Sequence, residues 1–401
     1  MFYEERSSSF FNVIYSIGLG LLPLLSLLDL NFHGITVERI FLIIFSLIAV
    51  VRLCTNYSFK VSKKPFFAIF LYCLIISFNI FYYESCGLFG FVSLWIVLIV
   101  DLAISPGIMM DFTVYKKTVS FVAIICTVLI FLQYVVYYGI GSYWNPIPTA
   151  IYRKDVILAY SNFLSSGLEG NLLRPSAIFL EPSHFAEYSI IALVIQLFFD
   201  KDGLKKSVII TIGILLSTSG LGIIAATIAW GIKIFGDKKE TPKKIATSLF
   251  GIVAIIVVIY FIMESIGVAS LLLSKFRINS DNSGFISRYR YVEVAFRNWS
   301  AKEYLIGVGF DSSSDYWLPG FFSIVRQIGI VGLFALLVIL VSIFKISDKM
   351  GKCLVIVYAW LLMVAEVSTM TYMVFYLSPA CFIYLSSFHR NRVDRLLSCI
   401  D

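Results

Sequence analysis

The chain has 401 residues, of which 59% are apolar or aromatic and only 14% are charged, and its mean hydropathy is +0.89. Soluble domains carry close to a quarter of charged residues, so this composition excludes an ordinary soluble protein and predicts an integral membrane protein. The net charge of +7 does not indicate a nucleic-acid binder, because the Lys and Arg residues lie between apolar runs. Seven cysteines without a CxxC pair and only three histidines argue against a disulfide framework or a zinc site.

Apolar runs long enough to cross a bilayer, which takes about 20 residues, follow one another along the chain. The clear runs are 9–30, 39–54, 65–83, 86–105, 118–140, 184–200, 245–264 and 327–344. Two further stretches are ambiguous. Residues 207–235 could be one span or two short ones meeting at Ser217–Gly220, whereas 353–388 is too long for one span and has polar residues at Glu366–Thr371.

The distribution of charge decides between these readings. If both ambiguous stretches are hairpins, roughly two thirds of the 32 Lys and Arg residues lie on one side, as expected of the cytoplasmic side. A single span at 207–235 would translocate the lysine-rich segment 238–244 and place the two long loops, 141–183 and 265–326, on opposite sides. We therefore predict one all-α polytopic membrane domain over residues 1–401, with about 12 transmembrane helices, both termini cytoplasmic and both long loops outside.

Loops this long are unusual between packed spans and indicate a function on the outer face. The first loop ends in Asn171–His184, which places Arg174, Glu181 and His184 within eleven residues. Pro182 suits a first helical turn, so the next span should begin near Glu181 with its positive dipole end available to a phosphate. Arg174 offers a bidentate fork for the same group. The alternatives are a surface pair of Arg174 with Glu181 and an interfacial hydrogen-bonding role for His184.

The second loop contains a helical pattern from Phe285 to Asn298, behind a turn cluster of Ser, Asp, Asn and Gly residues. Arg290, Glu293 and Arg297 share one ridge of this helix, where each arginine can pair with the glutamate, so the ridge is typical of a solvated face. Arg288 lies on the other flank of the apolar stripe. Of these arginines, Arg288 is therefore the one expected to lie in a partly buried cleft. The alternative is that its side chain snorkels toward the lipid surface.

Three carboxylates could lie within the membrane: Asp101, Glu187 and Glu366. Such groups are costly unless they face a wet cavity. Glu187 and Glu366 could line an outer cavity, and Asp101 is expected nearer the inner face. The Ser217–Gly220 tip should lie below the outer surface between short helices, which is tolerable only where its backbone borders a cavity.

Several short motifs occur in a distinctive order: Arg174–Ala186 (RPSAIFLEPSHFA), Leu216–Gly220 (LSTSG), Arg288, Gly307–Gly309 (GVG) and Gly329–Leu333 (GIVGL). In this order they resemble the O-antigen polymerase branch of the bacterial polymerase and ligase superfamily. The resemblance covers about residues 170–335 through motifs and the rest of the chain through topology. The first motif is fairly specific, and the glycine motifs are informative mainly through their order.

The resemblance implies a metal-independent, inverting glycosyltransferase with a C-type fold, located in the bacterial inner membrane with its active site facing the periplasm. Such polymerases of lipopolysaccharide biosynthesis transfer a growing glycan from undecaprenyl diphosphate to the non-reducing end of a lipid-linked repeat unit. The implied partners are the undecaprenyl-diphosphate-linked oligosaccharide, membrane lipids, and the chain-length regulator and flippase of the same pathway. No cofactor, metal ion or nucleic acid is expected.

The site residues follow from this chemistry. Arg174 and Arg288 would stabilise the diphosphate leaving group, Glu181 is the first choice for the base that serves the acceptor hydroxyl, and His184 is the reserve. The expected substrate-binding set is Arg174, Arg288, Arg290, Ser217, Ser219, Gly307 and Gly309.

Three other functions remain open. Related O-antigen ligases carry a histidine shortly before the counterpart of Gly329, and its absence from Tyr316–Gln327 favours a polymerase over a ligase. A lipid-linked oligosaccharide flippase would not need two long outer loops, and its charges should line a central passage. A structural partner of a polysaccharide export complex is the third alternative.

Overall fold

The computed structural model describes residues 9–28, 36–55, 63–85, 87–147, 149–169, 172–199, 203–236, 289–312 and 316–381. The expected span at 245–264, the lysine-rich segment 238–244 and Arg288 lie outside these ranges. The described chain is helical except for one hairpin of two short strands, β1 (Leu168–Glu169) and β2 (Leu172–Leu173). It forms two compact units, Met1–Thr118 with Tyr291–Asp401 and Val119–Arg290.

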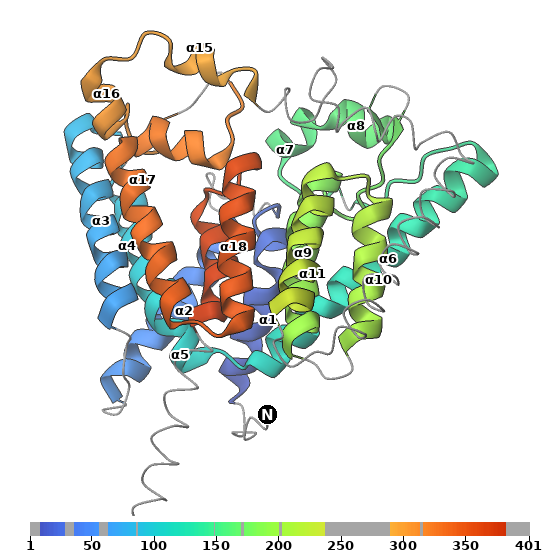
Figure 1. The fold of residues 1–401 in the computed structure, drawn as a ribbon, viewed down its shortest axis with the longest axis horizontal. Helices are drawn as coiled ribbons and strands as arrows, with labels where there is room; N and C mark the ends of the chain where they lie inside the picture. The colour runs from blue at the N-terminus through green and yellow to red at the C-terminus, as the bar shows by residue number, and fades with distance from the viewer. Residues whose placement is uncertain are drawn as a thin grey trace, which may run out of the picture. The chain divides into compact units, whose positions relative to one another are not determined.

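The first unit holds the amino-terminal and carboxy-terminal helices (Figure 1). Its elements are α1 (Phe10–Leu25), α2 (Val37–Thr55), α3 (Lys63–Tyr83), α4 (Leu88–Trp95), the π-helix η1 (Ile96–Ile104), α5 (Ser105–Met109), α15 (Val292–Phe296), α16 (Ala301–Ile306), α17 (Gly320–Ile346) and α18 (Lys349–Val364). Helix α17 packs along α3, α16 and α18. Residues 370–381 form a further helix.

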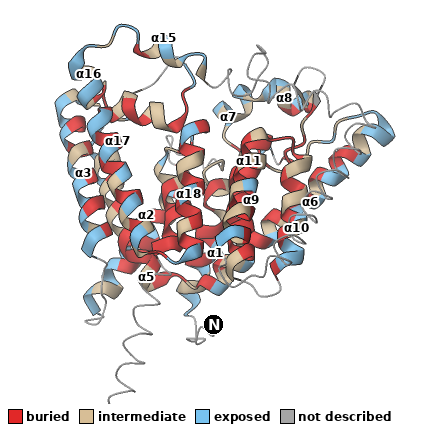
Figure 2. Ribbon diagram, in the orientation of Figure 1, coloured by how far each residue is buried: buried red, intermediate tan, exposed pale blue. Residues whose placement is uncertain are grey.

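The second unit is built around one buried helix. Its elements are most of α6 (Phe112–Ile140), α7 (Lys154–Ala159), α8 (Ser161–Ser166), the hairpin, α9 (Pro182–Phe199), α10 (Gly203–Leu216) and α11 (Gly220–Gly236). Almost every residue of α9 is buried, as Figure 2 shows, because α10 and α11 both pack against it. Helix α9 is therefore hydrophobic on all sides, as expected of an enclosed helix.

Five helices of the described chain are long and apolar enough to cross a membrane: Lys63–Tyr83, Gly90–Met109, Phe112–Ile140, Pro182–Phe199 and Gly320–Ile346. The protein is therefore an all-helical, multi-pass membrane protein, and the count of about 12 spans stays a prediction. Other helices fall short of the length required for a full span. Helices α1, α10, α11 and α18 have 16, 14, 17 and 16 residues, against the roughly 20 needed for a full crossing.

Both expected helix breaks are present. Helix α10 ends at Leu216 and α11 begins at Gly220, and α18 ends at Val364 before the helix that starts at residue 370. Helix α9 begins at Pro182, where the sequence placed the start of a span. Polar residues correctly predicted the breaks after α10 and α18, and a proline correctly predicted the start of α9. Both kinds of residue disfavour a continuous helix at those positions.

The expected continuous helix from Phe285 to Asn298 is wrong in its described part. A turn at residues 290–291 precedes α15, which covers only Val292–Phe296. Tyr291 stacks on Tyr316 with ring centroids 5.3 Å apart, and Phe296 packs on Trp299 at 4.4 Å. These aromatic contacts favour a bent segment over the local helical pattern, because tertiary packing overrides weak propensity.

Candidate functional site

The loop that carries the first motif is anchored to the end of α6 by Gln133. This side chain is fully buried, and its Nε2 donates to the Tyr143 hydroxyl at 3.0 Å. Its Oε1 accepts from the backbone N–H of Ala177 at 3.0 Å. Ala177 has a φ of 53°, in the left-handed region that non-glycine residues rarely adopt. The buried amide thus holds a strained turn in the middle of the motif.

Tyr143 also closes the base of the β1–β2 hairpin. A Cβ on Gly167, which has a φ of 62°, would lie 2.2 Å from the Tyr143 ring, so only glycine fits there. The Gly167 carbonyl accepts from the Arg174 backbone N–H at 2.9 Å. Burial raises the pKa of Tyr143, and the hydrogen bond from Gln133 opposes the rise. Tyr143 is therefore a neutral hydroxyl that fixes the point at which Arg174 leaves the hairpin.

Arg174 and Tyr134 of α6 interact electrostatically. The Arg174 side chain is half-buried, and its charge acts electrostatically on the Tyr134 hydroxyl. Tyr134 donates from its hydroxyl to the Leu216 carbonyl at 2.8 Å, and Leu216 is the last residue of α10. Tyr134 therefore brings the first motif beside the turn that contains the second motif.

The turn between α10 and α11 is a buried row of hydroxyl side chains. Ser217 and Thr218 are fully buried and Ser219 is 1% exposed. Ser217 donates to the Ile214 carbonyl at 2.7 Å, which is a helix-terminating contact. Thr218 has a φ of 57°, and among the described residues its hydroxyl has no hydrogen-bond partner. A buried hydroxyl without a partner is costly, so Thr218 is the member of the turn best suited to a ligand.

Glu181 immediately precedes the first residue of α9. Its side chain is half-buried and accepts from the Ser183 hydroxyl at 2.8 Å, and its carbonyl accepts from the Phe185 N–H. His184, in the first turn of α9, is half-buried with its ring 6.0 Å from that of Tyr160. Both residues thus stand at the positive dipole end of a long helix, as the sequence predicted.

The structure divides the expected site residues between the two units. Five of those in the second unit lie around the start of α9 and the α10–α11 turn: Arg174, Glu181, His184, Ser217 and Ser219. Arg290 is the last residue of that unit and is exposed, whereas Gly307 and Gly309 belong to the first unit. Arg288 lies outside the described residues.

The solvated ridge of the second loop is confirmed. Arg297 pairs with Glu293 at 3.1 Å, and both side chains are largely exposed. An exposed pair of this kind adds little stability. Arg290 is also exposed, so a substrate contact by Arg290 would have to occur at the surface of its own segment.

Gly307 is required by a close backbone approach within the first unit. Its φ is 79°, and a Cβ there would lie 2.4 Å from the Gln327 carbonyl oxygen. Reciprocally, a Cβ on Gly329, with a φ of 72°, would lie 2.1 Å from the Leu305 carbonyl oxygen. Gly329 interrupts the helical geometry of α17 at this point. The Gly307–Gly309 motif thus makes a close approach to the backbone of α17.

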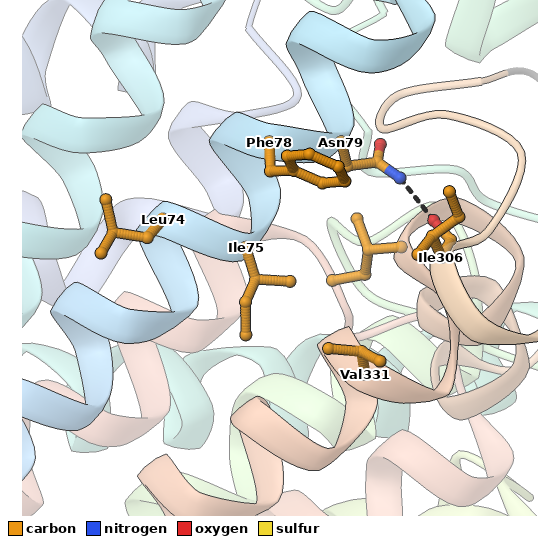
Figure 3. Close-up of a pocket in the computed structure, with 7 residues that line it drawn as sticks. Leu74, Ile75, Phe78, Asn79, Ile306 and Val331 are labelled. Atoms are coloured by element: carbon orange, nitrogen blue, oxygen red, sulfur yellow. Dashed lines mark hydrogen bonds between the residues drawn. The ribbon is translucent and has the colours of Figure 1, made fainter.

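Asn79 of α3 is hydrogen-bonded to the segment that contains Gly307 and Gly309 (Figure 3). Its Nδ2 donates to the Ile306 carbonyl at 2.5 Å, and its Oδ1 accepts from the Phe310 N–H at 2.6 Å. The Tyr83 hydroxyl donates to the Gly307 carbonyl at 2.7 Å. A Cβ on Gly309, whose φ is 123°, would meet the Ser85 Cβ at 3.3 Å. These contacts give both glycines a structural role, and their contact with substrate stays a prediction.

The three carboxylates expected within the membrane have different surroundings. Asp101 is fully buried within η1, Glu187 is 4% exposed in α9 and Glu366 is exposed after α18. Among the described residues, neither oxygen of Asp101 accepts a hydrogen bond, although the Ser46 and Ser105 hydroxyls lie near it. The described chain contains no group of three His, Cys, Asp or Glu side chains that could hold a metal ion.

Sequence reasoning missed Gln133, Tyr134 and Thr218. Gln133 could have been found, because it is the single amide in the apolar run 118–140 and a polar group in such a run needs a partner. Tyr134 carried no such signal, because this chain has 23 tyrosines. Thr218 was inside a recognised turn, and only its unpartnered hydroxyl in the described structure distinguishes it.

The fold and the polar cluster define an α-helical multi-pass membrane protein with an arginine, a carboxylate and buried hydroxyls gathered at one end of a helical layer. No model of a known protein family matches the chain, and no curated protein matches it.

Proposed function

We propose that this protein is a surface-polysaccharide polymerase of the bacterial inner membrane. It transfers a growing glycan from undecaprenyl diphosphate to the non-reducing end of a lipid-linked repeat unit, at the periplasmic face of a protein with about 12 spans. The observation that carries the proposal is the electrostatic interaction of Arg174 with Tyr134, whose hydroxyl donates to the Leu216 carbonyl at the end of α10. The first motif and the Leu216–Gly220 motif belong to the same unit.

The cluster suits a diphosphate. Arg174 supplies a planar fork of donors, the start of α9 supplies a positive dipole end with free N–H groups, and the Thr218 hydroxyl lacks a protein partner within the described chain. A diphosphate leaving group gains charge as its bond to the sugar breaks, and fixed donors in a buried site stabilise that charge. Arg288 is the proposed second cation, and Arg290, Ser217 and Ser219 are the proposed additional contacts.

The proposed reaction is a single displacement with inversion. The acceptor hydroxyl oxygen forms a bond to the anomeric carbon of the donor glycan while the bond from that carbon to the diphosphate oxygen breaks. The leaving diphosphate takes the bonding electron pair, and Glu181 takes the proton of the hydroxyl. The hydrogen bond from Ser183 orients the Glu181 carboxylate, and His184 is the reserve base, half-buried in the first turn of α9.

Deletion of the gene and complementation with variants tests this function in cells. The proposal expects the deletion strain to accumulate single repeat units on lipid that are accessible at the outer face. Arg174→Lys should fail to restore long chains at a normal protein level, because lysine cannot reproduce the bidentate fork. Arg153→Lys is the matched control, because Arg153 is in the same outer loop and its ion pair with Asp155 is exposed.

Two outcomes would contradict the polymerase. Accumulation of repeat units only at the inner face would indicate a flippase. Long lipid-linked chains that are not attached to their final acceptor would indicate a ligase. Full chain length from Arg174→Lys would remove Arg174 from the site whatever the reaction.

A further inference from the structure

An apolar groove runs along the seam between α3 and α17, within the first unit. Its volume is about 650 Å³, and its walls include Phe67, Leu71, Phe334, Leu337 and Val341. Phe67 and Phe334 are each 67% exposed, whereas Ala68, which forms part of the floor of the groove, is 4% exposed. Large apolar side chains around an open groove favour a hydrocarbon chain over water.

Three lysines stand at one end of this groove: Lys63, Lys64 and Lys345. Lys63 and Lys64 begin α3, and Lys345 is in the last turn of α17. Among the described residues, none of the three takes part in an ion pair. The nearby Asp348 already accepts from the Gly351 N–H as the cap of α18. The end of the groove is therefore cationic through its three lysines, because the positive dipole end of α3 and the negative dipole end of α17 meet there and offset each other.

The depth of the groove matches one leaflet. Its α3 wall runs from Lys63 to Leu71, which at 1.5 Å per residue is about 12 Å. Half of a hydrocarbon core of about 30 Å is about 15 Å. A separate hollow of about 300 Å³ follows along the same seam, lined by Leu74, Ile75, Phe78, Asn79, Ile306, Ile328 and Val331 (Figure 3). An acyl chain of one leaflet therefore matches the length of the groove.

We propose that this groove binds one anionic phospholipid, with the phosphate held among Lys63, Lys64 and Lys345 and one acyl chain lying between α3 and α17. Lysines in this position are common at the cytoplasmic ends of spans, and basic pockets between helices on that side suit anionic head groups. The lipid belongs to the leaflet on the lysine side. This site is independent of the proposed enzymatic function, because it involves neither Arg174 nor the α10–α11 turn.

The test is lipid binding to the purified full-length protein in neutral detergent, measured by native mass spectrometry with dioleoyl phosphatidylglycerol or dioleoyl phosphatidylcholine as the probe. Each lysine near an anionic head group contributes about a factor of five in affinity. The triple variant Lys63→Gln, Lys64→Gln and Lys345→Gln should therefore lose on the order of a hundredfold in phosphatidylglycerol affinity and little in phosphatidylcholine affinity.

A matched control removes the same charge elsewhere. Lys117, Lys205 and Lys206 are exposed lysines at the starts of α6 and α10, and their replacement by Gln should leave the high-affinity phosphatidylglycerol site intact. A second variant, Ser342→Phe, keeps all lysines and fills the groove at a half-buried lining position. It should also weaken phosphatidylglycerol binding, which surface attraction alone would not explain.

Three results would overturn the proposal. The first is equal affinity for the two phospholipids in the unmodified protein. The second is unchanged phosphatidylglycerol binding in both the lysine variant and Ser342→Phe. The third is displacement of phosphatidylglycerol by an equimolar long-chain polyprenyl phosphate, which would assign the groove to an isoprenoid lipid instead.

Discussion

Replacing Gly329 by alanine should open the contact between the Gly307 segment and α17. The backbone of Gly329 has a φ of 72° and a ψ of −177°, a combination that is essentially restricted to glycine and costs other residues about 1–3 kcal/mol. The added Cβ would lie 2.1 Å from the Leu305 carbonyl oxygen. Ordinary carbon–oxygen contacts are about 3.3 Å or longer, so the two backbones must separate by roughly 1 Å.

This separation stretches two backbone hydrogen bonds that close the contact. They run from the Val308 N–H to the Arg326 carbonyl at 2.9 Å and from the Gly309 N–H to the Gln327 carbonyl at 3.2 Å. Each contributes about 1 kcal/mol net. Together with the backbone strain, the substitution should cost about 3–5 kcal/mol, a large fraction of the stability of a typical folded protein.

Thermal unfolding of the purified protein in detergent measures this cost. Gly139→Ala is the control, because Gly139 lies in α6 with nothing within 4 Å of its added Cβ. It should be neutral or stabilising by up to about 1 kcal/mol, since alanine is the better helix former. A Gly329→Ala protein that unfolds within about 1 kcal/mol of the unmodified protein would refute the argument that glycine is required by this backbone contact.

Three other predictions concern single polar groups. Tyr134→Phe removes the hydroxyl that donates to the Leu216 carbonyl. It should lower the free energy of unfolding by about 1–3 kcal/mol and shorten the glycan product. Normal stability with a product of normal length would contradict both the structural and the functional role of this hydroxyl. Asp101→Asn keeps the side-chain shape and removes a buried ionisable group that has no ion pair among the described residues. The unfolding temperature should therefore stay the same or rise, and a drop of several degrees would contradict this prediction. The Ser300 hydroxyl and N–H lower the pKa of Glu303. The stabilisation of α16 by this cap is therefore complete above the ordinary carboxyl pKa and is lost as pH falls through the lowered pKa. Hydrogen exchange in α16, corrected for the intrinsic exchange rate, should show less protection at low pH, and constant protection would refute the prediction.

Sequence reasoning succeeded where a local rule fixes the backbone. Pro182 suits the first turn of a helix, and α9 begins there. The Ser217–Gly220 segment combines hydroxyl residues with glycine, which favour a turn over a helix interior, and α10 and α11 are separate helices on either side of it. The pairing of Arg297 with Glu293 follows from helical spacing alone.

It failed where distant segments decide the outcome. The link from Tyr134 to Leu216 joins residues 82 positions apart, and no local pattern in an apolar run announces it. Gly329 lies inside an apolar run, and the residues that leave no room for a Cβ there are Leu305 and Ile306 on the facing backbone. The helix expected at Phe285–Asn298 is interrupted where Tyr291 stacks on Tyr316, a contact outside the window that a helical pattern considers.

The most direct test of the proposed function is glycan synthesis by the purified protein in liposomes that contain only undecaprenyl-diphosphate-linked repeat units. The account predicts a ladder of longer lipid-linked glycans, which Arg174→Lys abolishes and Arg153→Lys retains. Absence of any chain longer than one repeat unit from the folded, unmodified protein, with the repeat units instead moved across the membrane, would contradict it.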